Sequence, residues 1–192
     1  MIKNKLYKMN VLNNHKTFKN ENIGYVSEFC CPDLFKITNS KTVSKQIKII
    51  EKVAKNLAKE KSNIILFTGN ITSNYFLYKF FVTSLSKYTK IYSPNKKYIF
   101  VLGSYEIMPF KNLGVHKIVE KYKNFLNENG MFLLYNSIFY ELPNRKCKTM
   151  EFSQLQYNRN SNITSKLKFS DFVIFGSTGF AGYNGKKNFK CT

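Results

Sequence analysis

Two short apolar runs, residues 63–68 and 98–102, limit most strongly what this chain can fold into. They read Asn-Ile-Ile-Leu-Phe-Thr and Tyr-Ile-Phe-Val-Leu, and each stops at a glycine, at Gly69 and at Gly103. Such short, nearly continuous apolar runs are typical of strands buried on both faces, as in parallel sheets covered by helices. The sequence therefore predicts an α/β protein whose strands end in glycine-containing loops.

The segments around these runs have the spacing of amphipathic helices. Apolar residues recur at intervals of three and four over residues 42–59, and lysines fill the outer positions. The same spacing predicts helices over residues 74–87 and 115–128, with Gly130 in the left-handed position that follows a helix. In the helix over residues 74–87 we expect four side chains to be buried: Phe76, Phe80, Phe81 and Leu85.

Further apolar segments complete the expected architecture. We predict strands at residues 23–27, 131–135, 138–142 and 172–175, a tight turn at Asn136 and Ser137, and a short helix near residues 162–168. Residues 1–22 are polar and are interpreted as a leader before one domain at residues 23–192. Because strands and helices alternate, we expect a largely parallel or mixed sheet with its site at the carboxyl ends of the strands.

The composition is strongly basic. Lys and Arg number 31 against 11 Asp and Glu, a formal net charge of +20, and such a balance normally indicates an anionic partner. Only Arg145 and Arg159 are arginines, however, whereas proteins that read nucleic-acid sequence rely on bidentate arginine. The lysines are also mixed with Asn, Ile, Phe and Tyr, as in proteins from AT-rich genomes. We therefore do not expect nucleic acid as a partner.

The cysteines and the hydropathy pattern exclude other classes. Cys30, Cys31, Cys147 and Cys191 form no Cys-x-x-Cys pair, so neither a zinc ribbon nor a disulfide framework is expected. Residues 1–22 contain no apolar stretch of signal-peptide length, and no later stretch is long enough to span a membrane. These observations predict a reduced, cytoplasmic protein without a membrane partner.

The strand-end loops carry a series of motifs. In chain order they read Ser27-Glu28-Phe29-Cys30, Gly69-Asn70, Gly103-Ser104-Tyr105-Glu106 and Gly176-Ser177-Thr178-Gly179-Phe180-Ala181-Gly182-Tyr183-Asn184. This order resembles the calcineurin-like metallophosphoesterases, whose blocks read S-D-x-H, G-D, G-N-H-E and, in one bacterial branch, G-x-T-G-F-A-G-Y-N. The resemblance covers residues 23–188. It implies the amino-terminal half of an α-β-β-α sandwich, and hydrolysis of phosphate esters with divalent metal ions such as manganese, iron or zinc.

The resemblance also places metal ligands at positions that this chain has changed. Glu28 and Cys30 stand where the first block has Asp and His. Asn70 stands at the Asp that bridges two metal ions, and Ser104 at a ligand Asn. A neutral amide does not neutralise charge between two cations, so the change at Asn70 is the most damaging to a dinuclear centre.

The third block would also supply the acid for the leaving group. Tyr105 stands at the position of that catalytic His, and a phenol with an ordinary pKa of about 10 is a poor acid at neutral pH. Glu106 matches the family, where it supports the site without binding metal. The chain has two histidines, and we interpret the one in the helix over residues 115–128, His116, as a solvated residue at the helix start.

Three functions stay open from the sequence. The favoured one is an impaired or inactive phosphoesterase relative, a pseudoenzyme that binds divalent metal incompletely or not at all. The second is a hydrolase with one metal ion held by Glu28, Cys30 and Asn70. The third is a non-catalytic basic domain that binds a phosphorylated ligand or nucleic acid over the same strand ends.

The family's carboxyl-terminal histidine block does not follow residue 184. The resemblance therefore implies an incomplete sandwich, truncated relative to the family. We expect the sheet surface that this exposes to cause self-association or to be covered by a partner chain.

Overall fold

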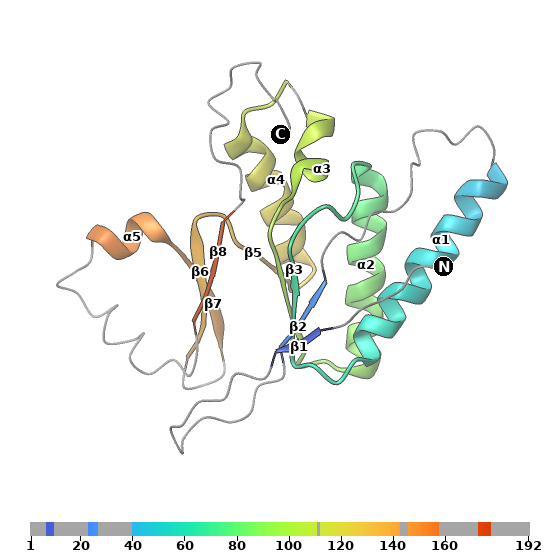
Figure 1. Ribbon diagram of the computed structural model, residues 1–192, viewed down its shortest axis with the longest axis horizontal. Helices are drawn as coiled ribbons and strands as arrows, with labels where there is room; N and C mark the ends of the chain where they lie inside the picture. Colours follow the sequence, from blue (N-terminus) through green and yellow to red (C-terminus); the bar gives the residue numbers. More distant parts are fainter. Residues whose placement is uncertain are drawn as a thin grey trace.

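The described part of the chain forms three layers (Figure 1). In this computed structural model it comprises residues 7–9, 23–26, 40–110, 112–142, 146–157 and 173–177. Helices pack on one face of a five-stranded sheet, and a three-stranded antiparallel sheet packs on the other face. The fold is therefore mixed α/β, as the sequence predicts.

The larger sheet follows the order of the chain. Its strands, from edge to edge, are β1 (Tyr7–Met9), β2 (Ile23–Val26), β3 (Ile64–Phe67), β4 (Lys97–Phe100) and β5 (Phe132–Leu133). Strands β2 to β5 are parallel, and β1 is antiparallel to β2. Val26 lies opposite Phe67, and Phe67 lies opposite Phe100, so β2, β3 and β4 end at the same level. This arrangement confirms the expectation of a largely parallel sheet.

The strand β1 falls within residues 1–22, which the sequence analysis assigned to a polar leader. Tyr7–Met9 pair with β2 at the edge of the sheet. The alternation of three residues is too short to be recognised as a strand among polar neighbours. The other residues of this segment lie outside the described part of the chain.

Three helices connect the parallel strands. The helical elements are α1 (Ser40–Lys59), α2 (Tyr75–Tyr92), α3 (Ser104–Ile107), the 3-10 turn η2 (Met108–Phe110), α4 (Val115–Glu128) and α5 (Phe152–Tyr157). Because consecutive strands are neighbours, right-handed crossovers place α1, α2 and α4 on one face. The bounds of α4 are those predicted, and Gly130 has a left-handed φ of 73°. No described helix is both long and apolar enough to cross a bilayer.

Aromatic side chains fill the core between the helices and the larger sheet. Phe67 and Phe100 stack with ring centroids 4.4 Å apart, and Tyr78 meets Tyr122 edge to face at 4.7 Å. Alternate residues of β3 and β4 point to opposite faces. Ile64 and the others on the far face therefore form a second cluster with the smaller sheet.

One predicted core residue is wrong. Phe76 is 63% exposed. Phe81 and Leu85 are buried as expected, and Phe80 is only partly buried. The preceding residue, Tyr75, turns inward instead and packs against α4. Phe76 is therefore displaced to the outer side of the first helical turn.

The smaller sheet packs β6 (Ser137–Glu141) between β7 (Cys147–Glu151) and β8 (Val173–Gly176), all antiparallel. The chain turns at Asn136, which has a φ of 47°, and passes there from the larger sheet to the smaller one. Two elements, β7 and α5, lie in a polar region for which no strand or helix was predicted. The short helix expected near residues 162–168 falls outside the described residues.

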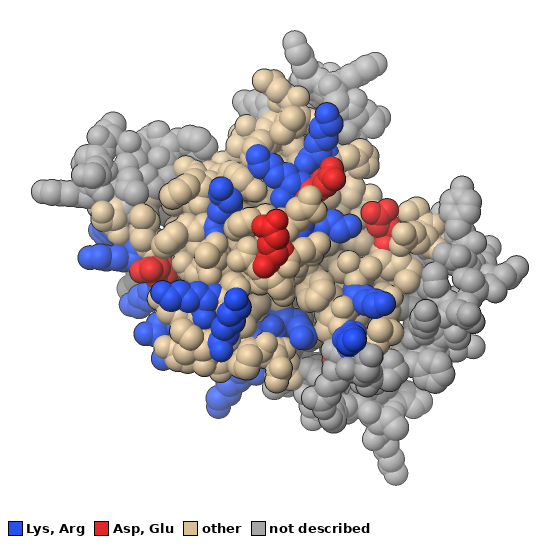
Figure 2. Space-filling model, turned by 180° about the vertical axis from the view of Figure 1, so that it is seen from behind, with Lys and Arg blue, Asp and Glu red and all other residues tan. Residues whose placement is uncertain are grey.

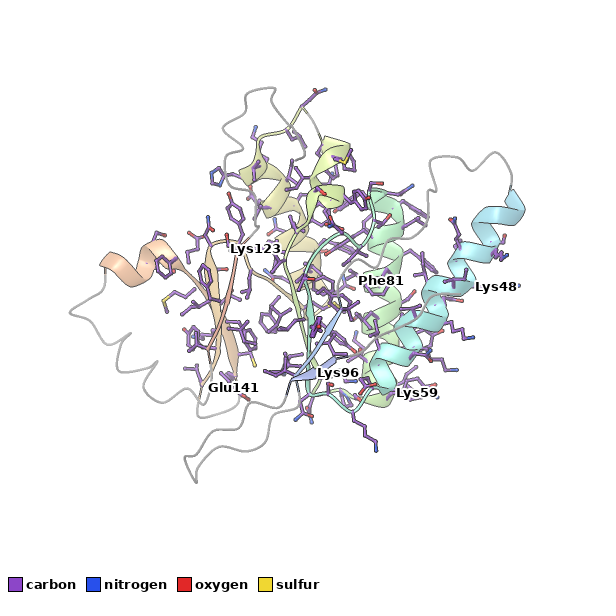
Figure 3. The ribbon with its side chains drawn as sticks, in the orientation of Figure 1. Lys48, Lys59, Phe81, Lys96, Lys123 and Glu141 are labelled. Atoms are coloured by element: carbon purple, nitrogen blue, oxygen red, sulfur yellow. The ribbon has the colours of Figure 1, made fainter. Side chains whose placement is uncertain are left out.

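Lys96 ties the end of α1 to the turn before β4. Its Nζ donates to the carbonyl oxygens of Leu57 at 2.8 Å, of Ala58 at 2.9 Å and of Glu60. The last carbonyls of a helix have no partner within it, and a cation there also complements the helix dipole. Only 8% of the Lys96 side chain is exposed, and Figure 3 shows it at the foot of the sheet near the end of α1.

We expect Lys96→Met to lower the free energy of unfolding by about 2 kcal/mol at pH 7, because it removes a charged donor from three carbonyl groups. Lys48→Met changes an exposed lysine on the same helix and should shift stability by less than about 0.5 kcal/mol. Urea unfolding of the two variants measures both values. Equal stabilities would contradict the capping role.

The same variant tests the burial of the ammonium group. Burial lowers the pKa of Lys96 to about 8, although nearby Glu60 opposes the shift. Because this folded-state pKa lies below the unfolded value of about 10.4, keeping the buried amine charged costs folding free energy, fully below pH 8 and no longer above about 10.4. The effect of Lys96→Met at pH 7 is the loss of the three hydrogen bonds, reduced by this cost. Between pH 8 and 10 the stability of the wild type should therefore rise relative to that of Lys96→Met.

Candidate functional site

The loops that follow β3 and β4 meet at the carboxyl edge of the larger sheet. After β3 the chain reverses through two consecutive residues of positive φ, Gly69 at 89° and Asn70 at 57°. Glycine adopts this conformation without strain, and asparagine tolerates it better than most residues. The loop then enters α2 at Asn74, whose Oδ1 accepts from the N–H groups of the first turn.

The two loops touch through their backbones. A Cβ placed on Gly69 would lie 2.5 Å from the backbone nitrogen of Gly103. A Cβ placed on Gly103 would lie 2.4 Å from both the backbone nitrogen and Oδ1 of Asn70. These distances are far below contact, so a side chain at either glycine would push the loops apart.

The carboxylate of Glu106 joins the loops by hydrogen bonds. Its Oε2 accepts from the backbone N–H of Asn70 at 3.0 Å and of Gly103 at 2.7 Å. Its Oε1 accepts from Ile71 at 2.6 Å and Thr72 at 3.1 Å. Glu106 is fully buried. Burial raises the pKa of this carboxyl above its usual value, and the four backbone donors oppose that shift.

A tyrosine of α4 supports this arrangement from below. The hydroxyl of Tyr122 donates to the backbone carbonyl of Glu106 at 3.0 Å. Burial, with a further effect of the nearby Glu106 carboxylate, raises the pKa of Tyr122 well above its usual value, so the phenol stays protonated and can donate. Helical spacing alone does not predict this hydrogen bond between residues of α4 and α3.

Asn70 and Ser104 lie next to each other on the outer side of the same loops. The Ser104 hydroxyl donates to Oδ1 of Asn70 at 3.1 Å, and the backbone N–H of Tyr105 donates to the same oxygen at 3.4 Å. The side chain of Tyr105 is 40% exposed. The structure therefore brings Asn70, Ser104 and Glu106 together. The exposed side chain of Tyr105 lies next to them.

The remaining predicted positions lie outside the described residues. These are Glu28, Cys30 and the segment of residues 178–184. The strand before Glu28 ends at the same edge, because the backbone N–H of Thr68 donates to the carbonyl of Val26 at 3.1 Å.

Comparison with known proteins leaves the family open. No protein-family model, curated protein or solved structure matches this chain. The phosphoesterase resemblance thus stays a prediction from four motifs, and the chemistry of the edge follows from its own contacts.

Those contacts fit a dinuclear metal centre poorly. Asn70 and Ser104 offer neutral oxygens that already hydrogen-bond each other. Both oxygens of Glu106 face backbone donors, and the described residues contain no group of three or more His, Cys, Asp or Glu placed to hold a metal ion. Two cations at close range need anionic ligands, which these described positions do not supply.

A cavity of about 630 Å³ lies at the opposite edge of the sheet, lined by residues 59–64 and 93–97 together with Glu141 and Cys147. Two of its lysines are already engaged. Lys96 caps α1, and Nζ of Lys59 lies 4.7 Å above the ring centroid of Tyr92. The cavity is separate from the predicted site, and Lys61 and Lys97 are its other two lysines.

Proposed function

We propose that this chain is a non-catalytic relative of the calcineurin-like metallophosphoesterases, with the amino-terminal half of their sandwich. The order of layers, helices then parallel sheet then antiparallel sheet, agrees with three of the four layers of that fold. The meeting of Asn70, Ser104 and Glu106 at one edge agrees with the motif order. Both observations support the proposal.

The observation that best supports a loss of catalysis is what the polar side chains at the ends of β3 and β4 bind to. Asn70 and Ser104 stand at ligand positions but are neutral and hydrogen-bond each other, whereas Glu106 keeps the supporting role that the resemblance implies. Hydrolysis by a metal-bound hydroxide needs a cation held and charge-balanced at this edge. We infer that the catalytic loops of the family serve here as a rigid clamp.

The same contacts argue against a phosphorylated ligand at this loop. Successive backbone N–H groups after a strand can form a concave site for an anion. Here the N–H groups of Asn70, Ile71 and Thr72 already donate to Glu106. The chain's own carboxylate thus occupies the place that a phosphate would need.

A hydrolysis assay tests the proposed function. We expect the purified chain to release no nitrophenol from nitrophenyl phosphate mono- or diesters in the presence of manganese or zinc. Asn70→Ala should give the same result, as should Asn56→Ala, an exposed control on α1.

Metal-dependent turnover by the wild type that falls at least about tenfold in Asn70→Ala, and not in Asn56→Ala, would overturn the proposal. A tenfold loss corresponds to about 1.4 kcal/mol of transition-state stabilisation. That outcome would favour the hydrolase with one metal ion held by Glu28, Cys30 and Asn70.

A further inference from the structure

Helix α1 carries a straight row of exposed lysines. The row consists of Lys45, Lys48, Lys52, Lys55 and Lys59, all exposed. Their spacing alternates between three and four residues, which places them on one side of a helix. The row is about 21 Å long at 1.5 Å per residue.

The opposite side of α1 is buried. Ile50 and Ala54 pack in the main core with α2, so the lysine row is directed away from the protein. Figure 1 places α1 at the outer border of the molecule, and Figure 3 shows Lys48 pointing outward from it. Basic side chains are also spread over the rear face in Figure 2. The row differs from these by its alignment on one outer helix.

An exposed apolar side chain lies where the row ends. Lys59 packs over the ring of Tyr92, and the residue before Tyr92, Ile91, is 61% exposed. The Tyr92 ring also stacks on Tyr88, with centroids 6.4 Å apart. A tyrosine and an aliphatic side chain beside lysines form the combination found at the boundary between lipid and water.

We propose that the lysine row, together with Ile91, binds the surface of an anionic lipid bilayer. A straight row on a convex helix can reach a flat surface with all its members at once. Each lysine close to such a surface strengthens binding about fivefold, and an exposed aliphatic side chain adds apolar contact. The expectation of no membrane partner rested on the absence of a spanning segment, which surface binding does not need.

Nucleic acid fits this surface less well. Single strands bind in concave basic grooves and stack their bases on free aromatic faces. Here the exposed apolar group is the aliphatic Ile91, and the ring of Tyr92 is already in contact with Lys59 and Tyr88. Among the described residues, only Lys59 of the row borders the cavity at the foot of the sheet. The other four lysines lie on the convex side of α1, where the described part of the chain offers no ring for a base to stack on.

Co-sedimentation with lipid vesicles tests the proposal. The full chain should bind vesicles of phosphatidylcholine with about one-third phosphatidylserine, should ignore pure phosphatidylcholine, and should dissociate as salt rises from about 0.1 M to 1 M. Replacing Lys45, Lys48, Lys52 and Lys55 with Gln should weaken binding about 600-fold, which is the product of about fivefold for each lysine. Gln is nearly as good a helix former as Lys, so α1 should stay intact.

A matched variant separates the row from net charge. Replacing Lys117, Lys121, Lys146 and Lys148 with Gln removes the same charge from exposed positions elsewhere, and it should weaken binding by less than about threefold if distant charges act only through a screened field. Equal losses in the two variants would overturn the proposal, as would failure of the wild type to bind anionic vesicles at low salt.

Two further measurements complete the test. Ile91→Ser leaves the charge and α1 unchanged and should weaken vesicle binding about fivefold, in line with partial burial of an aliphatic side chain. If this variant binds vesicles as tightly as the wild type, Ile91 is not part of the lipid-binding surface. Tighter binding to single-stranded or duplex DNA than to anionic vesicles, with the same dependence on the row, would overturn the proposal in favour of nucleic acid.

Discussion

Glu106→Ala is expected to lower the free energy of unfolding by about 4 kcal/mol, because it leaves four buried or half-buried N–H groups without their acceptor. Glu106→Gln should lose about 3 kcal/mol, since its amide nitrogen would face two N–H donors. Glu120→Ala, at an exposed position of α4, is the control and should change stability by less than about 0.5 kcal/mol. Urea unfolding at neutral pH measures all three.

A small carboxylate in solution should partly replace the lost side chain. Added formate is expected to raise the thermal midpoint of Glu106→Ala by several degrees more than that of the wild type, because ligand binding to the folded state stabilises it. A Glu106→Ala protein as stable as the wild type would show that the clamp contributes little.

Gly103→Ala is expected to destabilise the chain by about 3 kcal/mol or more, because its Cβ would overlap the backbone and side chain of Asn70 at 2.4 Å. Gly114→Ala is the matched control. Gly114 has a φ of −63° and no atom within 4 Å of its would-be Cβ, so this change should cost less than about 0.5 kcal/mol. If thermal unfolding gives the same midpoint for both variants, the two loops are not in close backbone contact at Gly103.

Local patterns in the sequence were sufficient to place α1, α2, α4 and the buried strands β3 and β4, although α2 runs to Tyr92, five residues beyond its predicted end. The helix over residues 115–128 has the predicted bounds because glycines flank an uninterrupted amphipathic repeat. The repeat was ambiguous at the start of α2, where Tyr75 and Phe76 are adjacent aromatic residues. Which of them turns inward depends on packing against Tyr122, a residue distant in sequence.

Pairings between distant segments could not be predicted in the same way. Strand β6 is joined to β5 by a short turn, yet it pairs with β7 and β8. Because β8 lies beyond α5, no local pattern links it to β6. Strand β7 has only half-buried and exposed residues and no apolar run to identify it.

The position of the candidate site could be predicted from the sequence, but the hydrogen bonds within it could not. Asn70 and Ser104 follow adjacent parallel strands, so their meeting is a direct consequence of strand order. The motif assigned a supporting role to Glu106, but not its four backbone donors. Those depend on the left-handed turn at Gly69 and Asn70, which directs successive N–H groups inward.

The strand order of the larger sheet has a consequence for how the chain can fold as it is synthesised. From β2 to β5, each strand pairs with the strand made just before it. A nascent chain can therefore add one strand and its helix at a time, without waiting for a later segment. The smaller sheet differs, because β6 stays unpaired on one edge until β8 has been made. The last strand pairing therefore has to wait until β7 and α5 have also been made. Until then, the exposed edge of β6 is where a ribosome-bound intermediate would be most vulnerable to wrong pairing.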